Sequence, residues 1–371
     1  MKVFITIPWF APAYRAGGPI QSIANLVANF NQNVKYYIFC SNVDLNGQTN
    51  ADVPFNEWVA YNSYTNVWYD TGLSTKDNFL QQNKILKPQV IFIIGLFSWK
   101  YNIVPLLYGN APKKILSVRG MLHPGALSQK KTKKKLYITL FRLLNLKKLV
   151  IFHATDAIEK EIVQNNFGNN SNICIAGNYA KCIAYQAPLY KITGALKLIT
   201  VALISPMKNH LLVLQALQNC KYNIEYTIIG PIKDTDYWAL CLQQIALLPS
   251  NIKVHYKAEV LPHFIQAELA NAHLFIMPSK SENFGHSLVE ALQAGKPIIT
   301  SHNTMWQYLD KHQAGININT TATEILNAIN FYAHMDNTDY LSHVNGAYNY
   351  IAARYSTATL QQQYNAMFYL N

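Results

Sequence analysis

Short apolar runs alternate along the chain with loops that contain Gly or Pro and with amphipathic segments of helical period. Runs of four to eight residues rich in Val, Ile, Leu and Phe are typical of buried strands, and apolar residues spaced three or four apart indicate helices. In the first half we predict strands over residues 3–7, 36–40, 90–95 and 115–118, and a helix over 19–30. Strands that alternate with helices imply parallel pairing in βαβ units.

This pattern weakens over residues 175–194, where Gly177, Pro188 and Gly194 interrupt it, and then restarts. We predict strands over 196–203, 224–229, 252–255, 274–277 and 297–300, and helices over 209–219, 287–294 and 357–370. A chain of 371 residues has the usual size of two α/β domains. The predicted fold is α/β, with two Rossmann-like doubly wound domains facing a central cleft. They span residues 1–180 and 195–355, and we expect a final helix, 356–371, to pack back on the N-terminal domain.

Composition narrows the range of partners. The formal net charge of +12 suggests an anionic partner, which could be nucleic acid, an anionic membrane surface or a phosphorylated ligand. Five scattered cysteines without a C-x-x-C pair indicate neither a disulfide framework nor a zinc site, and favour buried thiols in a reducing cytoplasm. Because no apolar run approaches the roughly 20 residues that span a bilayer, we expect a soluble or peripheral protein.

The informative polar residues follow predicted strands, which is where ligands bind in open α/β sheets. The strand at 274–277 leads into a loop that carries Glu282, and the helix that follows carries Glu290. Gly295 and Pro297 then end this helix. Glu290 lies among Leu and Val residues, where a carboxylate is costly without a partner, so a binding role is favoured over a solvated surface position.

The run from Glu282 to Pro297 resembles the E-x7-E motif of family 4 glycosyltransferases, which are retaining enzymes with the GT-B fold. The resemblance implies that Glu290 binds the ribose of a nucleotide-sugar donor. It implies that Glu282 acts in catalysis and, with the loop backbone, holds the donor sugar and diphosphate. The further donor-binding residues it implies are Asn283, Phe284, Gly285, Ser287, Gly230, Gly17 and Gly18.

Two other loops resemble parts of the same family. The loop at 204–209 places Lys208 where the family has a diphosphate-binding lysine, but Leu203 stands at the position of its arginine partner. Either another base, Lys280 or Arg119, substitutes for that arginine, or catalysis is impaired. Arg119 begins an R-G-M-L run found in a branch that makes cell-surface polysaccharide and lipopolysaccharide, and we expect it near the transferred sugar or an acceptor phosphate.

A basic stretch precedes an apolar, helix-forming segment at 136–149. Basic amphipathic helices are typical of membrane-surface or nucleic-acid elements, although a solvated helix face remains the alternative. We expect an anionic membrane surface as partner, at the inner face of the cytoplasmic membrane, and no nucleic acid, because no nucleic-acid motif accompanies the charge. The lysines concerned are Lys130, Lys131, Lys133, Lys134 and Lys135.

The resulting hypothesis is a cytoplasmic, retaining hexosyltransferase that uses a UDP- or GDP-sugar and a glycan or lipid-linked acceptor. We predict metal-independent transfer, because no D-x-D motif follows a predicted strand directly; Asp234 and Asp236 lie further on in a loop. The alternatives are a catalytically silent relative that binds a nucleotide sugar or partners another glycosyltransferase, a sugar-nucleotide epimerase, and an RNA- or lipid-binding protein that uses the lysines alone.

Overall fold

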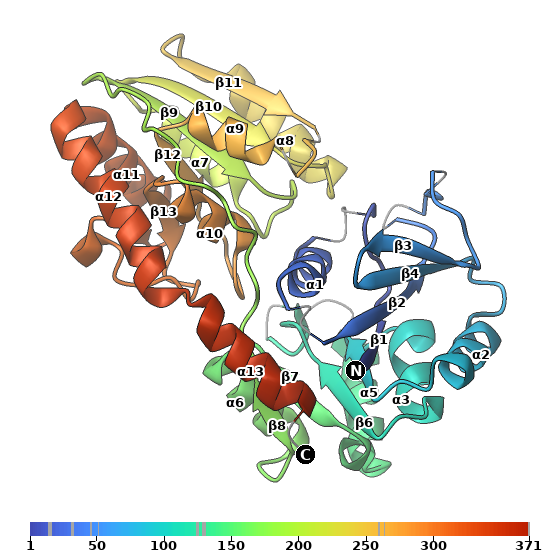
Figure 1. Ribbon diagram of the computed structural model, residues 1–371. Helices are drawn as coiled ribbons and strands as arrows, with labels where there is room; N and C mark the ends of the chain where they lie inside the picture. Colours follow the sequence, from blue (N-terminus) through green and yellow to red (C-terminus); the bar gives the residue numbers. More distant parts are fainter. Residues whose placement is uncertain are drawn as a thin grey trace. The chain divides into compact units, whose positions relative to one another are not determined.

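The computed structural model describes residues 1–13, 17–30, 33–44, 47–50, 52–123, 126–127, 131–258, 260–262 and 264–369. The chain forms two compact units. Unit 1 comprises Met1–Tyr179 together with Thr357–Asn371, and unit 2 comprises Ala180–Ser356. Each unit is built on one sheet covered by helices (Figure 1).

The sheet of unit 1 has the strand order β3-β4-β2-β1-β5-β6-β7-β8. Its central strand β5 is buried along its whole length, which explains the uninterrupted run Val-Ile-Phe-Ile-Ile. Strands β1, β2 and β4 to β8 pair in parallel, as the alternation of strands and helices predicts. The strands are β1 (Lys2–Thr6), β2 (Lys35–Ser41), β3 (Trp58–Asn62), β4 (Thr65–Asp70), β5 (Val90–Ile94), β6 (Lys113–Ser117), β7 (Ile151–Ala154) and β8 (Ile173–Ile175).

One edge of this sheet departs from the prediction of parallel pairing. Strand β3 runs antiparallel to β4, because only Ser63 and Tyr64 separate the two strands and so short a connection permits a hairpin but no crossover. The helices of unit 1 include α1 (Gly18–Asn29), α2 (Thr75–Leu86), α3 (Val104–Tyr108), α5 (Lys131–Leu143), α6 (Ala157–Phe167) and α13 (Thr357–Tyr369). A π-helical turn (Trp99–Ile103) and a 3-10 turn (Leu146–Leu149) complete its described elements.

The last helix, α13, belongs to unit 1 although the helix before it belongs to unit 2. Aromatic side chains attach α13 to the rest of unit 1. The ring of Tyr364 lies 5.4 Å from that of Tyr179 and 5.8 Å from that of Phe30, and Phe368 lies 5.7 Å from Phe92. Burial of these large rings stabilises the return of the chain.

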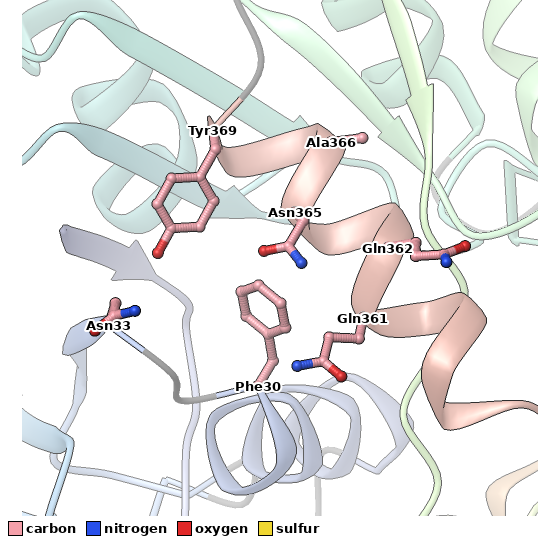
Figure 2. A pocket seen from close by; sticks show the side chains of 7 residues that line it. All are labelled: Phe30, Asn33, Gln361, Gln362, Asn365, Ala366 and Tyr369. Carbon is pink, nitrogen blue, oxygen red and sulfur yellow. The ribbon is translucent and has the colours of Figure 1, made fainter.

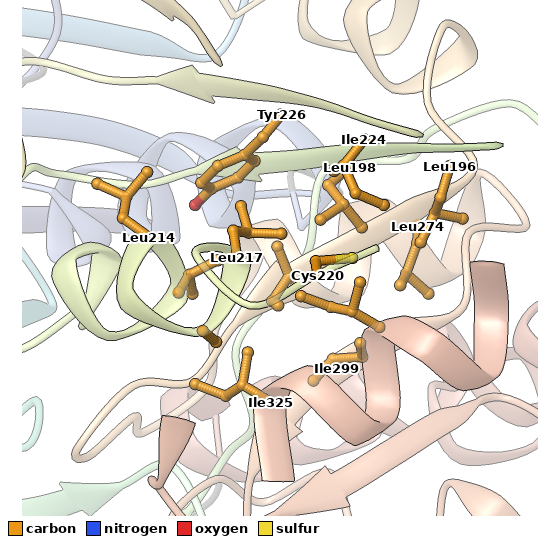
Figure 3. Close-up of a cluster of buried hydrophobic side chains, with 14 of the residues drawn as sticks. Leu196, Leu198, Leu214, Leu217, Cys220, Ile224, Tyr226, Leu274, Ile299 and Ile325 are labelled. Carbon is orange, nitrogen blue, oxygen red and sulfur yellow. The ribbon is translucent and has the colours of Figure 1, made fainter. Parts of the chain in front are cut away.

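The sheet of unit 2 is parallel, with the order β11-β10-β9-β12-β13-β14. Side chains from β9, β10 and β12 pack with those of α7 and α11 in a core that contains Leu198, Tyr226 and Leu214 (Figure 3). The strands are β9 (Ala195–Val201), β10 (Asn223–Ile229), β11 (Ile252–Lys257), β12 (Leu274–Met277), β13 (Ile298–Ser301) and β14 (Gly315–Ile318). The helices are α7 (His210–Leu217), α8 (Thr235–Ala246), α9 (Ile265–Ala270), α10 (His286–Gln293), α11 (Ala322–His334) and α12 (Asn337–Arg354), with a 3-10 turn at Asp310–His312.

Several helices of unit 2 begin at an Asp or Thr whose side chain accepts a hydrogen bond from the first turn. Asp234 caps α8 in this way, accepting from the backbone N–H of Tyr237 at 2.9 Å. The sequence analysis placed Asp234 and Asp236 in a loop, but Asp234 is the N-cap of α8 and Asp236 lies in its first turn. Within the described ranges, no helix combines the length and the apolar character needed to cross a membrane.

Candidate functional site

The strand order of unit 2 reverses between β9 and β12, since the chain moves outward to β10 and β11 from one and to β13 and β14 from the other. The loops that follow these two adjacent strands lie at the carboxyl edge of the sheet, which at a reversal of strand order is the usual position of a ligand in such folds. The loop after β9 carries Lys208, and the loop after β12 carries Glu282.

Lys208 and Glu282 form an ion pair across these two loops. The side chains are 20 % and 16 % exposed, so solvent screens the pair only in part. Two further hydrogen bonds join the same loops: Lys280 donates its backbone N–H to Met207 at 2.9 Å, and the Asn209 amide donates to Pro278 at 3.2 Å. The structure thus brings together two predicted site residues that lie 74 positions apart.

Helix α10 starts directly after this loop. Its N-cap is Gly285 with φ 72°, and no side chain caps its first turn. A Cβ on Gly285 would lie 2.8 Å from Leu288, so both the left-handed backbone and the packing require glycine. A helix N-terminus without a side-chain cap attracts anions through the positive end of the helix dipole. Ser287 is half-buried in the first turn, with its hydroxyl 3.9 Å from the Met277 sulfur.

Glu290 lies in the second turn of α10 and is only 4 % exposed. Its neighbours Val289 and Ala291 are fully buried. Burying a carboxylate among apolar side chains costs free energy, whereas a carboxylate at the surface has no such cost. The structure therefore agrees with the premise that singled out Glu290, namely that this carboxylate is inside the fold.

The loop after β13 supports the site from behind. The indole N–H of Trp306 donates to the carbonyl of Phe284 at 2.6 Å, and the backbone N–H of Glu282 donates to Asn303 at 3.1 Å. The hydroxyl of Ser301 donates to the carbonyl of Ser279 at 2.5 Å. The sequence gives no sign of this positioning role of residues 301–306, because such backbone contacts leave no spacing pattern.

Gly230 directly follows β10 and lies beside the loop after β9. It has φ 148°, and a Cβ there would lie 2.0 Å from the carbonyl oxygen of Ala202. Glycine is therefore required by the close approach of two backbones. Leu203, which follows Ala202 in the loop after β9, is half-buried. Lys280 is exposed, and its backbone is hydrogen-bonded to the loop that carries Lys208. Of the two bases considered as substitutes for the missing arginine, Lys280 lies in unit 2 with Lys208, whereas Arg119 lies in unit 1.

His210, the first residue of α7, is a buried polar residue that sequence analysis did not single out. It is 1 % exposed, and neither ring nitrogen has a hydrogen-bond partner among the described residues. Burial, with a smaller contribution from the nearby charge of Lys208, lowers its pKa to about 3. The ring is therefore neutral at physiological pH and adds no charge to the site.

The candidates from the first domain all lie in unit 1. Gly17, with φ 80°, is the N-cap of α1, and Gly18 and Pro19 are the first two residues of this helix. Arg119 follows β6 with φ 49° and is 9 % exposed. It donates to the side chain of Asn178, while its Nε and Nη2 have no partner among the described residues.

The lysines of the basic stretch differ in their exposure. Lys130 and the side chain of Lys131 lie outside the described residues. Lys133 and Lys135 are exposed on α5. Lys134 is half-buried, with its ammonium 5.3 Å from the Phe97 ring and donating to the carbonyl of Ala126 at 2.6 Å. Lys134 therefore packs against unit 1, unlike its two exposed neighbours.

Two cavities lie away from the predicted residues. One of about 480 Å³ in unit 1 is lined by the end of α1 and by α13, including Phe30, Asn365 and Tyr369 (Figure 2). Another of about 380 Å³ lies at the amino ends of β9 to β11. None of the predicted site residues lines either cavity. Among the described residues, no group of three or more His, Cys, Asp and Glu side chains could hold a metal ion.

Residues 184–340 match the family described as glycosyl transferases group 1. A search of curated proteins found no match. Solved structures that resemble the whole chain include Anabaena HepE in complex with UDP and glucose, at 16 % identity and TM-score 0.72 over 100 % of this chain and 99 % of that one.

Two further structures extend the likeness. Sucrose-phosphate synthase from Thermosynechococcus elongatus matches with 12 % identity and TM-score 0.72, over 99 % and 98 % of the two chains. WaaG, a glycosyltransferase involved in lipopolysaccharide biosynthesis, matches with 12 % identity and TM-score 0.69 over the full length of both. These likenesses confirm the predicted fold of two Rossmann-like domains. Residues 184–340 are thus similar to glycosyl transferases group 1, and the chain as a whole has the GT-B fold of two Rossmann-like domains.

Proposed function

We propose that the chain transfers a hexosyl group, with retention, from a UDP- or GDP-sugar to a glycan or lipid-linked acceptor in cell-surface polysaccharide biosynthesis. One observation carries the proposal: the Lys208–Glu282 pair joins the loops at the strand-order reversal of unit 2, directly before the uncapped α10 that contains Glu290. A cation, a helix N-terminus and two carboxylates together suit a ligand that has both a diphosphate and hydroxyl groups.

In this proposal the donor lies across α10. Glu290 accepts hydrogen bonds from the ribose hydroxyls, and Glu282 accepts them from the sugar. The backbone of Asn283, Phe284 and Gly285 follows the diphosphate into the helix N-terminus. Ser287 and Gly230 complete the donor side.

Catalysis would be mainly electrostatic. As the bond between the anomeric carbon and the diphosphate oxygen breaks, negative charge grows on the leaving phosphate. Lys208 and the N-terminus of α10 stabilise that charge in the transition state. The leaving phosphate accepts the proton of the acceptor hydroxyl, whose oxygen forms the new bond on the face that the diphosphate leaves. Gly17, Gly18 and Arg119 are proposed to serve the transferred sugar or the acceptor, and no metal ion is required.

The diphosphate clamp differs from the family pattern at Leu203. We propose Lys280 as the substitute base, supported by its exposure and by the hydrogen bond from its backbone to Met207. A lysine binds phosphate as a point charge, whereas an arginine offers two parallel donors, so the clamp should hold the diphosphate less tightly than an arginine-containing one.

The choice of donor and pathway draws on the neighbours. Anabaena HepE was crystallised with UDP-glucose, which supports UDP over GDP, and WaaG acts in lipopolysaccharide biosynthesis, which supports a cell-surface product. The cytoplasm, at the inner face of the membrane, remains the expected place of the reaction.

The deciding experiment titrates the protein with UDP, GDP and UDP-glucose by calorimetry and assays release of nucleotide with and without a chelator. We expect Glu290→Gln to weaken binding of nucleotide and nucleotide sugar by about tenfold or more, since a charge-assisted hydrogen bond is lost. Glu161→Gln, an exposed glutamate of α6, is the matched control. Unchanged turnover by Glu290→Gln would sink the proposal, and loss of turnover in the chelator would remove its metal-independent part.

A second candidate is a silent relative that binds the nucleotide sugar or a partner glycosyltransferase without turnover. Leu203 in place of the expected arginine is the observation that favours it. The same titrations separate the two, because a silent relative would bind the donor and release no nucleotide with any acceptor.

A further inference from the structure

Helix α5 of unit 1 has apolar side chains on two opposite faces. Ile138 and Phe141 are buried in the core of unit 1, 7 % and 1 % exposed. On the same helix Leu136, Leu140 and Leu143 are 60 %, 46 % and 75 % exposed. The core therefore accounts for one of the two apolar faces and leaves the other unexplained.

The exposed leucines form one row. Their spacing of four and then three residues places them above one another on a helix of 3.6 residues per turn. Ile138 and Phe141 fall on the far side of the same turns, which agrees with their burial. Leu144 follows at the end of the helix and is 66 % exposed. A row of this kind differs from the scattered exposed leucines of an ordinary surface.

Positive charge accompanies this row. Lys133 and Lys135 are exposed, and α5 contains no acidic residue. None of the ion pairs formed by described side chains involves either lysine. Arg142 donates to the carbonyl oxygens of Asn165 and Asn166, at the end of α6. Two lysines thus remain available to an external anionic partner beside exposed apolar side chains.

An anionic lipid bilayer matches both features at once. A helix that lies in the bilayer interface inserts its apolar face between the headgroups and places basic side chains against the phosphates. A soluble anion would use the lysines but leave the leucine row in water, and nucleic acid would do the same.

We infer that α5 is an interfacial helix by which unit 1 attaches to an anionic membrane surface, with Leu136, Leu140 and Leu143 inserted and Lys133 and Lys135 on the headgroups. This inference adds a location to the proposed function. Vesicle binding tests it, and the result of that test does not depend on which group the chain transfers.

Flotation of the full chain with lipid vesicles tests the inference. We expect binding to phosphatidylcholine vesicles that contain phosphatidylglycerol, weaker binding to phosphatidylcholine alone, and further weakening as salt rises. Substituting Leu136, Leu140 and Leu143 together by glutamine should weaken binding by roughly fivefold per leucine. The pair Lys133→Gln and Lys135→Gln should weaken it by roughly fivefold per lysine and flatten the salt dependence.

Helix α8 offers a matched control. Leu240, Leu242 and Leu247, on and just after α8, are 50 %, 50 % and 63 % exposed, and α8 contains no basic residue. Substituting these three by glutamine should leave vesicle binding unchanged. Thermal denaturation checks that each variant is folded, and Leu143→Gln alone, at the most exposed position, replaces the triple variant if that one unfolds.

Three results would overturn the inference. The first is no binding to either kind of vesicle, and the second is equal vesicle binding by the α5 and α8 leucine variants. The third is a dimer of the wild-type chain, detected by analytical sedimentation, that is lost in the α5 leucine variant. In the last case the occupant of the leucine row is a second copy of the chain. Donor binding measured on the same variants separates this failure from a failure of the proposed function, because none of the substituted residues belongs to the donor site.

Discussion

Replacing Glu282 by glutamine removes one negative charge from the loop after β12 and leaves the shape of the side chain nearly unchanged. Its partner Lys208 then remains in a site where its side chain is only 20 % exposed. Two unit charges about 4 Å apart attract by about 4 kcal/mol at an effective dielectric constant of about 20. Desolvation and residual solvent exposure reduce this value, so we expect a coupling free energy of about 2 kcal/mol.

A double-mutant cycle measures that coupling. Urea denaturation of the wild type, Glu282→Gln, Lys208→Met and the double variant gives the four free energies of unfolding. The pair Lys257–Glu268 is the matched control, because its atoms are 2.6 Å apart but Lys257 is 46 % exposed. For this control pair we expect a coupling below about 1 kcal/mol.

The same variants separate the two roles proposed for the site. Glu282→Gln should weaken UDP-glucose binding about tenfold and leave UDP binding unchanged, since UDP lacks the sugar that Glu282 is proposed to hold. Lys208→Met should weaken the binding of UDP and of UDP-glucose about equally, because both ligands carry the diphosphate.

Two outcomes would refute the reasoning. A coupling for Lys208–Glu282 no larger than that of the control pair would show that the ion pair is as screened as a surface one. Equal losses of UDP and UDP-glucose affinity in Glu282→Gln would show that Glu282 does not distinguish the sugar.

Three other substitutions test single features of unit 2. Gly230→Ala should lower the free energy of unfolding by about 2–4 kcal/mol, because its Cβ would lie 2.0 Å from a backbone oxygen; an unchanged urea midpoint would contradict the geometry. Leu203→Arg should tighten UDP binding about tenfold in calorimetry by restoring a phosphate fork, and no gain would mean that this position does not reach the diphosphate. Lys296 is fully buried, and burial lowers its pKa from 10.5 to about 8, so Lys296→Met should stabilise the protein at pH 7 by roughly 3 kcal/mol. Between pH 8 and 10.5 the unfolded chain binds a proton that the folded chain has lost, so the wild type gains stability relative to the variant as pH rises, and the difference in urea midpoint should shrink toward zero. A difference that stays constant with pH would show that Lys296 is not the source.

Local patterns were sufficient to predict most elements. The strand at 274–277 agrees with β12 at both ends, and the helix expected over 287–294 is α10, shifted by one residue. Strand periodicity, glycine turns and the apolar run around Glu290 are properties of neighbouring residues, so the sequence contains them directly. The helix predicted over 136–149 is less accurate: α5 ends at Leu143, because the left-handed backbone of Asn145 interrupts the apolar pattern.

Contacts between distant residues depended on the order of the strands. The pairing of Lys208 with Glu282 follows from β9 and β12 being neighbours, which no local pattern specifies. The support of the Phe284 carbonyl by Trp306 follows in the same way from β13 lying beside β12. The residue types on α5 likewise did not determine which side chains are exposed. Leucine and isoleucine are similarly hydrophobic, yet packing buries Ile138 and leaves Leu143 in solvent. Sequence periodicity therefore predicts which segments fold and what they carry, whereas only packing decides which side chains meet and which stay exposed, because that choice is made by contacts far apart along the chain.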